Sequence, residues 1–266
     1  MEGEENLLES PDLTFVLGDT TSVCSALPDE SFSLIHSDLP FNTGRVQKGN
    51  AGQYEDKFED FGAWLTEQVT LYRRLLAPKG VLALQLDDRE YVTLRSVCNA
   101  VMGSDNYRGT LIWHYDTGGL AKNWWSMKHQ YIVLYGSGKE EPVFHADQVP
   151  LVPRKALPKK VVNAAGEEKV YGGDKKLCSV WNMNWSTTDP QRCGYPSQKP
   201  SSLAETLIRV HTNEGDWVLD PCCGSGTTGF AAHALRRNAV IVDKNPDALA
   251  AAKARVERNK KQSGEP

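Results

Sequence analysis

The sequence predicts an α/β fold: a mostly parallel sheet with helices on both faces, in a circularly permuted order. Strand-like and helix-like segments alternate along most of the chain, which is typical of such a sheet. A buried strand at 217–219 leads into a glycine-rich turn at 224–229 and then a helix, an arrangement that binds nucleotide-like ligands. Fewer than 40 residues follow Gly229. The remaining strands must therefore come from upstream, so the ligand-binding half stands last in the chain.

Short apolar runs bounded by turn residues predict the strands, and apolar positions at helical spacing predict the helices. The expected strands are 13–17, 33–37, 81–86, 110–115, 130–135, 217–219 and 239–243, with 110–115 and 130–135 forming a pair. The expected helices are 61–76, one ending near 102, one opened by Pro200, 230–235, and one that begins with Asn245 as N-cap and Pro246 as first residue. Residues 42–54 are polar, glycine-rich and without a period, which predicts a long binding loop or lid.

Residues 140–180 differ in character from the chain on either side. They carry four prolines and show little periodicity. We expect this segment to be an inserted recognition element, with a core formed by residues 1–139 and 181–266. A solvated surface loop is the simpler interpretation of its charges when they are considered alone. These charges include Arg154, Lys155, Lys159 and Lys160.

Composition indicates a globular chain with free thiols. The net charge of −4 and the apolar content of 40% do not by themselves indicate a nucleic-acid partner. The six cysteines form no C-x-x-C pair and have no zinc spacing, so we expect no bound metal and a cytoplasmic location. No apolar run approaches the roughly 20 residues of a membrane span. The acidic N-terminus shows no signal peptide.

Four aspartates stand at or just after the ends of predicted strands: Asp19, Asp38, Asp220 and Asp243. Ligands of parallel sheets bind beyond the carboxyl ends of the strands, so these acids are expected around one site. The glycine triplet of the 224–229 turn formally matches a dinucleotide fingerprint, with Asp243 placed to hold ribose hydroxyls. A carboxylate at Asp220 would repel a pyrophosphate and attract an ammonium group. This favours S-adenosylmethionine over a nicotinamide cofactor.

The segment Asp38-Leu39-Pro40-Phe41 leaves the second strand with groups suited to the exocyclic amino group of a base. The nitrogen lone pair of such a group is delocalised into the ring, so the group is a poor nucleophile. A carboxylate and a backbone carbonyl that accept its two hydrogens would direct the lone pair at an electrophile, while an aromatic ring stacks on the base. Considered alone, an Asp-x-Pro turn after a strand is the commoner occurrence.

Together these segments resemble the amino-methylating DNA methyltransferases of the permuted beta class. Residues 38–41 match the family's catalytic Asp/Ser/Asn-Pro-Pro-Tyr/Phe motif, and 220–228 match its Asp-Pro-Phe-x-Gly-Ser-Gly-Thr-Thr cofactor loop. Residues 194–200, Gly-Tyr-Pro-Ser-Gln-Lys-Pro, are similar to its Tyr/His-Pro-Thr-Gln-Lys-Pro element. The motifs stand in the beta-class order, and the similarity spans nearly the whole chain apart from 140–180. The resemblance implies a Rossmann-like, S-adenosylmethionine-dependent methyltransferase fold.

The resemblance further implies a site-specific DNA methyltransferase that acts on N6 of a flipped adenine in double-stranded DNA. Asp38 and the Leu39 carbonyl would accept the amino hydrogens, and Phe41, after Pro40, would stack on the base. The residues implied to hold the cofactor are Asp19, Ser197, Gln198, Lys199, Asp220, Pro221, Cys222, Gly224, Ser225, Gly226, Thr227 and Asp243. The candidates for DNA contact are Lys122, Trp124, Trp125, Lys128, Arg154, Lys155, Lys159 and Lys160. For the first four of these, a partly buried hairpin edge is an equal alternative.

Two departures from the family pattern leave alternatives open. Leu39 stands where proline is usual, which loosens the turn and adds a backbone donor. Cys222 replaces a phenylalanine; Pro221-Cys222 suggests a cytosine C5-methyltransferase nucleophile, but it lies inside the cofactor loop and is expected to pack. The alternatives are N4-cytosine methylation, a weakly active or non-catalytic DNA-binding subunit, and, from the glycine triplet alone, a nicotinamide enzyme. A homodimer or a partner subunit that supplies further DNA contacts also stays open.

Overall fold

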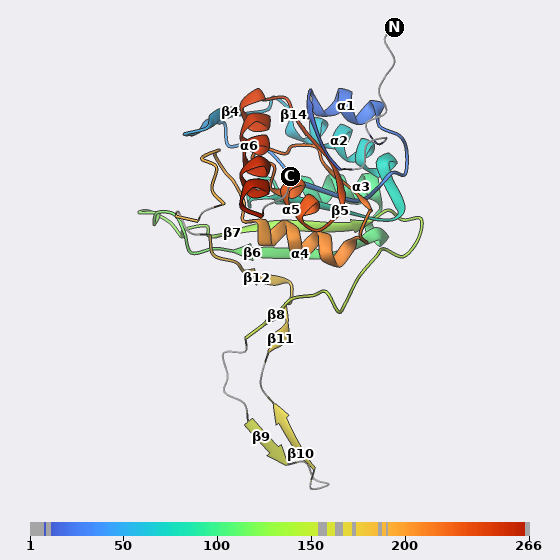
Figure 1. Ribbon diagram of the computed structural model, residues 1–266, viewed down its shortest axis with the longest axis vertical. Coiled ribbons are helices and arrows are strands. Elements are labelled where there is room, and N and C mark those ends of the chain that lie inside the picture. Colours follow the sequence, from blue (N-terminus) through green and yellow to red (C-terminus); the bar gives the residue numbers. More distant parts are fainter. Residues whose placement is uncertain are drawn as a thin grey trace.

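An eight-stranded sheet forms the centre of the protein in the computed structural model (Figure 1). The structure describes residues 8, 12–153, 159–162, 167–171, 174–185, 188–189 and 191–263. The strands of the sheet are β1 (Leu13–Leu17), β2 (Phe32–Asp38), β5 (Leu76–Leu86), β6 (Tyr107–His114), β7 (His129–Gly136), β12 (Val180–Asn182), β13 (Trp217–Asp220) and β14 (Asn238–Asp243). They are ordered β1-β14-β13-β2-β5-β7-β6-β12. Neighbours are parallel except at β5–β7 and β6–β7.

The last strands of the chain complete the sheet formed by the first ones. β13 and β14 lie between β1 and β2, and all four run parallel. The predicted pair β6 and β7 is antiparallel. The predicted mostly parallel α/β fold with a permuted order is therefore confirmed.

Helices cover both faces of the sheet (Figure 1). One face carries α1 (Thr20–Ala26), α2 (Phe61–Leu75) and α3 (Tyr91–Met102). The other face carries α4 (Ser201–His211), α5 (Thr227–Ala234) and α6 (Pro246–Ser263). A short 3-10 helix, η1 (Ser104–Asn106), follows α3. Alternate side chains of β2 enter the two cores, Ile35 on the α2 face and Leu34 on the α4 face. Each such buried side chain contributes about 1.5–3 kcal/mol. Within the described ranges, no helix has the length and apolar content needed to span a bilayer.

Capping residues mark where helices α5 and α6 begin. The Asn245 side chain accepts a hydrogen bond from the Asp247 amide (3.0 Å), and Pro246 is the first residue of α6, as the sequence predicts. α5 begins at Thr227, earlier than the predicted start at 230. The reason is that Gly226, with φ of 70°, acts as its N-cap.

The stretch 42–54, for which the sequence predicts a long loop, forms instead an antiparallel hairpin of β3 (Arg45–Gly49) and β4 (Gly52–Asp56). A Cβ at Gly49 would lie 2.5 Å from the Gly194 carbonyl oxygen, so the hairpin packs closely on the 194–200 segment. The buried carboxylate of Asp56 accepts hydrogen bonds from the amides of Asn42 (2.8 Å) and Thr43 (3.2 Å). These bonds fix the hairpin to the residues that follow Phe41.

Two short strand pairs project away from the sheet (Figure 1). β8 (Leu151–Val152) pairs with β11 (Lys175–Lys176), and β9 (Lys159–Val162) pairs with β10 (Glu168–Tyr171), both antiparallel. Before these strands, the chain packs on the end of α4, where the His145 amide donates to the Val210 carbonyl (2.8 Å). After them, β12 rejoins the sheet beside β6. The projecting strands span fewer residues than the 140–180 segment that the sequence singles out. The recognition role of this segment stays a prediction.

Candidate functional site

Four carboxyl groups meet at one edge of the sheet. Asp19 follows β1, Asp243 ends β14, Asp220 ends β13 and Asp38 ends β2. These strands are parallel neighbours, and all four aspartates line one cavity of about 520 Å³. The structure thus brings together the strand-end acids that the sequence singles out.

The same cavity gathers the expected motifs. Asp38, Leu39, Pro40 and Phe41 line it. The expected cofactor residues in its wall are Asp19, Ser197, Gln198, Lys199, Asp220, Pro221, Cys222, Gly224, Ser225, Thr227 and Asp243. Gly226 does not line the cavity: a Cβ there would lie 2.6 Å from the Cβ of Ala252 on α6. Glycine at position 226 therefore serves the left-handed turn and the packing against α6.

Carboxylates hold the glycine-rich loop in place. Asp243 accepts hydrogen bonds from the amides of Gly224 (2.9 Å, Oδ2) and Asn245 (2.8 Å, Oδ1). Asp220 Oδ1 accepts from the Cys222 amide at 3.3 Å. The backbone of the loop is thus fixed to the ends of β13 and β14 before any ligand arrives.

Asp220 is a buried acid without a protein cation. It is 3% exposed, and burial raises its pKa to about 7, with the nearby carboxylates of Asp38 and Asp243 adding to the rise. Among the described residues, no lysine, arginine or histidine forms an ion pair with it. A positively charged group of a ligand would compensate the negative charge of the buried Asp220 carboxylate.

Asp38 is paired on one oxygen and free on the other. Lys199 Nζ lies 2.5 Å from Asp38 Oδ2 and also donates to the Ser197 carbonyl (3.0 Å). Burial raises the pKa of the Asp38 carboxyl, and the Lys199 ammonium opposes that rise. In the part of the chain that the structure describes, Asp38 Oδ1 is buried and has no hydrogen-bond partner. Lys199, expected only beside the cofactor, therefore also contacts Asp38, which keeps one oxygen without a described partner.

Leu39 adds a backbone donor, as the sequence predicts, and the structure shows that this donor is used. Its amide donates to the Gln85 carbonyl (3.0 Å), which continues the pairing of β2 with β5 beyond Asp38. Its side chain is 2% exposed and packs in the core on the α2 face. The added donor is therefore used, and the turn is held by a hydrogen bond and by packing in place of a proline ring.

Asp19 and Cys222 have local roles that the sequence did not show. Asp19 Oδ1 accepts hydrogen bonds from the amides of Thr21 (3.0 Å) and Ser22 (3.3 Å), so it caps α1. Burial raises the pKa of the Cys222 thiol, which disfavours the thiolate that a nucleophile requires. A packing role for Cys222 is consistent with this environment.

The sequence did not predict several residues that line the larger cavity. His36 lies two residues before Asp38 on the same face of β2, with Nδ1 2.9 Å from Thr228 Oγ1; burial lowers its pKa to about 4, so it is neutral at pH 7. Tyr54 stacks on Tyr195, with ring centroids 6.3 Å apart. The two-residue period of a strand would have found His36. Tyr54 lies on the hairpin for which the sequence predicts a loop.

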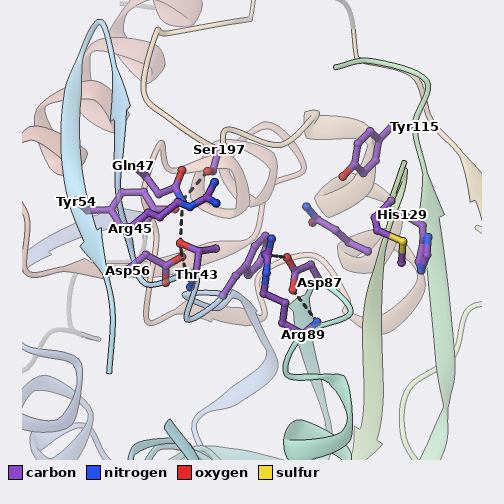
Figure 2. A pocket seen from close by; sticks show the side chains of 13 residues that line it. Thr43, Arg45, Gln47, Tyr54, Asp56, Asp87, Arg89, Tyr115, His129 and Ser197 are labelled. Atoms are coloured by element: carbon purple, nitrogen blue, oxygen red, sulfur yellow. Dashed lines mark hydrogen bonds and ion pairs between the residues drawn. The ribbon is translucent and has the colours of Figure 1, made fainter. Parts of the chain in front are cut away.

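A second cavity, of about 300 Å³ (Figure 2), shares lining residues with the first. Phe41, Tyr54 and Ser197 line both cavities. The other residues in its wall come from the β3–β4 hairpin and the ends of β5, β6 and β7: Thr43, Arg45, Gln47, Asp56, Asp87, Arg89, Tyr115, Met127, His129 and Gln130. A ring of polar groups around an aromatic side chain suits a planar, hydrogen-bonding ligand such as a base.

The expected DNA-contact residues differ in their surroundings. Lys122, Trp124 and Trp125 are exposed on the segment between β6 and β7, so the alternative of a partly buried hairpin edge does not hold for them. Lys128 is engaged within this segment, because its ammonium donates to two of the segment's carbonyls. The other four are Arg154, Lys155, Lys159 and Lys160. Only the backbone of Lys159 and Lys160 is described, and Arg154 and Lys155 lie outside the described residues.

Known proteins match this chain over most of its length. Residues 32–254 match the N6 and N4 methyltransferase family described as "DNA methylase". "DNA adenine methyltransferase YhdJ" of Escherichia coli (strain K12) is 25% identical over 240 residues, 88% of this chain and 79% of that protein. The fold is similar to that of the "M1.HpyAVI-SAM complex", with a TM-score of 0.65, 19% identity and coverage of 92% of this chain and 98% of that one. It is also similar to the PvuII DNA methyltransferase (cytosine-N4-specific), with a TM-score of 0.69, 17% identity and 98% coverage of each chain.

We expect Leu39→Pro to destabilise the protein, although proline is the usual residue of the motif. The variant removes the amide that donates to Gln85, and an unsatisfied buried acceptor costs about 1–3 kcal/mol. Urea unfolding measures the loss. Leu39→Met keeps the donor and most of the volume, so this control should cost less than about 1.5 kcal/mol. A proline variant as stable as the methionine variant would contradict the role assigned to the Leu39 amide.

Proposed function

This chain belongs to the N6 and N4 DNA methylase family, and from this premise we propose that it transfers the methyl group of S-adenosylmethionine to N6 of adenine in a specific DNA sequence. The observation that carries the proposal is the state of Asp38. Its Oδ2 is neutralised by Lys199, while its buried Oδ1 has no described partner. Asp38 lines the same cavity as Asp220, the buried acid whose charge a cationic ligand would compensate.

The larger cavity suits S-adenosylmethionine by its charge. Asp220 would pair with the ammonium of the methionine end, and the fixed amides of the 222–227 loop would lie along that end. Asp243 would accept hydrogen bonds from the ribose hydroxyls, and Asp19 would lie near the adenine ring. When bound, the cofactor supplies a methyl group made electrophilic by its sulfonium. The residues of the chain bind and orient it beside Asp38.

The smaller cavity would receive the flipped target base. Phe41, which lines both cavities, would stack on the base and return about 1–3 kcal/mol of the few kcal/mol that flipping costs. Asp38 Oδ1 and the Leu39 carbonyl would accept the two amino hydrogens and so direct the nitrogen lone pair at the methyl group. Lys199 favours the ionised form of Asp38, and an ionised carboxylate only accepts hydrogen bonds.

Adenine is preferred to cytosine as the target because the relative named as an adenine methyltransferase matches 88% of this chain. The likeness to a cytosine-N4-specific enzyme, at 17% identity, concerns the fold, and N4-cytosine methylation is the second candidate. The alternative of a non-catalytic subunit, which the Leu39 substitution raised, is less favoured, because the Leu39 amide and side chain hold the 38–41 segment in place.

We also propose that duplex DNA extends from the smaller cavity over residues 151–176, where lysines and Arg154 would contact phosphates and make binding salt-dependent. A homodimer or a partner subunit would lengthen this contact, and gel filtration with and without DNA distinguishes these forms from a monomer. A cytoplasmic location stays a prediction.

Transfer of tritiated methyl groups to DNA, followed by nucleoside chromatography, tests the proposed reaction. The label should appear in N6-methyladenine. Asp38→Ala should lower the rate by on the order of 10²–10³-fold, because it removes an acceptor that acts on the reacting nitrogen, with cofactor affinity nearly unchanged. Asp105→Ala, at an exposed acid of η1, is the control. Label in methylcytosine would support the second candidate, and lost cofactor binding in Asp38→Ala would show that Asp38 is misassigned.

Cofactor affinity should depend on pH through Asp220. With a pKa of about 7 in the free protein, this acid is mostly protonated below pH 7 and must release its proton to pair with an ammonium. The dissociation constant should therefore rise by up to about tenfold per pH unit as pH falls below 7. Calorimetry with S-adenosylmethionine between pH 5.5 and 7.5 measures this slope. Asp220→Asn should bind weakly with a flat profile; an unchanged slope in that variant would assign the titration to another group.

A further inference from the structure

Two adjacent tryptophans stand exposed on the segment between β6 and β7. Trp124 is 79% exposed and Trp125 is 81% exposed, and Leu120 on the same segment is 86% exposed. Large apolar side chains gathered in water mark a surface that another molecule covers. The segment projects from the end of β6 and β7 that faces the β3–β4 hairpin side of the molecule (Figure 1).

Hydrogen bonds within the segment hold the tryptophans at its tip. At its base, the Tyr115 amide donates to the Lys128 carbonyl (3.0 Å). The Lys128 ammonium then donates to the carbonyls of Thr117 (2.7 Å) and Gly118 (2.8 Å), and nearer the tip the Ala121 amide donates to Ser126 Oγ (2.7 Å). Hydrogen bonds thus join the two sides of the segment at three places, and residues 122–125 form its tip, which we call the braced tip.

The base of this segment is part of the smaller cavity. Tyr115, Met127 and His129 line it, and Trp125 is two residues from Met127. Figure 2 shows Arg45, Gln47 and Tyr54 on the opposite side of the cavity from Tyr115 and His129. A duplex that delivers a base to this cavity would therefore lie against the braced tip.

We propose that residues 115–128 form a wedge, in which Trp124 and Trp125 enter the DNA base stack and fill the space that the flipped adenine leaves. This inference rests on the proposed function and adds the means by which the base is kept out of the duplex. Tryptophan rings stack on bases of any sequence, and apolar side chains inserted between base steps are an established way of opening a duplex. Lys122, exposed beside the tip, supplies a charge for the adjacent phosphate.

The wedge is tested on two duplexes that carry the protein's own methylation sequence, as identified by methylome sequencing. In one, thymine is opposite the target adenine; in the other, an abasic site is opposite, so the adenine is already unpaired. Single-turnover methylation is measured for the wild type, Trp124→Ala, Trp125→Ala, Trp125→Phe and Val92→Ala. Val92, on α3, is 73% exposed and serves as the control for loss of an exposed apolar side chain.

At least one alanine variant should methylate the paired duplex about 10- to 100-fold more slowly and the abasic duplex within about threefold of the wild type. Trp125→Phe should recover most of the rate, and Val92→Ala should be unchanged on both duplexes. Misfolding cannot mimic this pattern, because the abasic duplex reports on the same protein.

Equal losses on both duplexes, or no loss on the paired duplex, would overturn the wedge and leave the proposed function intact. Methylome sequencing that finds no N6-methyladenine added by the protein would instead overturn the proposed function and the wedge with it.

Discussion

Four parallel strands end side by side, and each end carries a carboxyl group: Asp19, Asp243, Asp220 and Asp38. Negative charge gathered in a buried cavity is costly unless it is hydrogen-bonded or paired with a cation. The fold meets this constraint in three ways. Asp19 and Asp243 are bonded to backbone amides, Asp38 is paired with Lys199, and Asp220 accepts a hydrogen bond from the Cys222 amide and has a pKa raised to about 7. The glycine-rich loop, the 38–41 segment and residues of the 194–200 segment line one cavity with these acids.

The pair of Asp38 and Lys199 links two segments 161 residues apart in sequence. It places a cation in the wall of the larger cavity, with Lys199 Nζ 5.1 Å from the centroid of the Phe41 ring. The Lys199 ammonium opposes the rise that burial causes in the Asp38 pKa, and it leaves one carboxylate oxygen without a described partner. The neighbouring Leu39 stands where proline is usual in the motif. A hydrogen bond to Gln85 and a buried side chain hold the turn there.

Local signals in the sequence predict the fold and most residues of the larger cavity. Apolar runs mark the strands, and the late glycine turn requires a permuted sheet, so Asp38, Asp220 and Asp243 could be placed at one edge. Partners distant in sequence could not be found this way, since no local pattern connects Lys199 with Asp38 or Leu39 with Gln85. The β3–β4 hairpin was missed because its strands are polar and lack apolar alternation. Its order comes from close packing on residues 194–200.

The central claim is that a buried, unpaired Asp220 selects a cationic cofactor. A double-mutant cycle at pH 7.5 tests it most directly, with calorimetric affinities of S-adenosylhomocysteine and its desamino analogue for the wild type and Asp220→Asn. Loss of the ammonium should weaken binding to the wild type by about 10- to 100-fold, the value of a charge-assisted hydrogen bond, and should change binding to Asp220→Asn little. Equal losses in both proteins would contradict the claim.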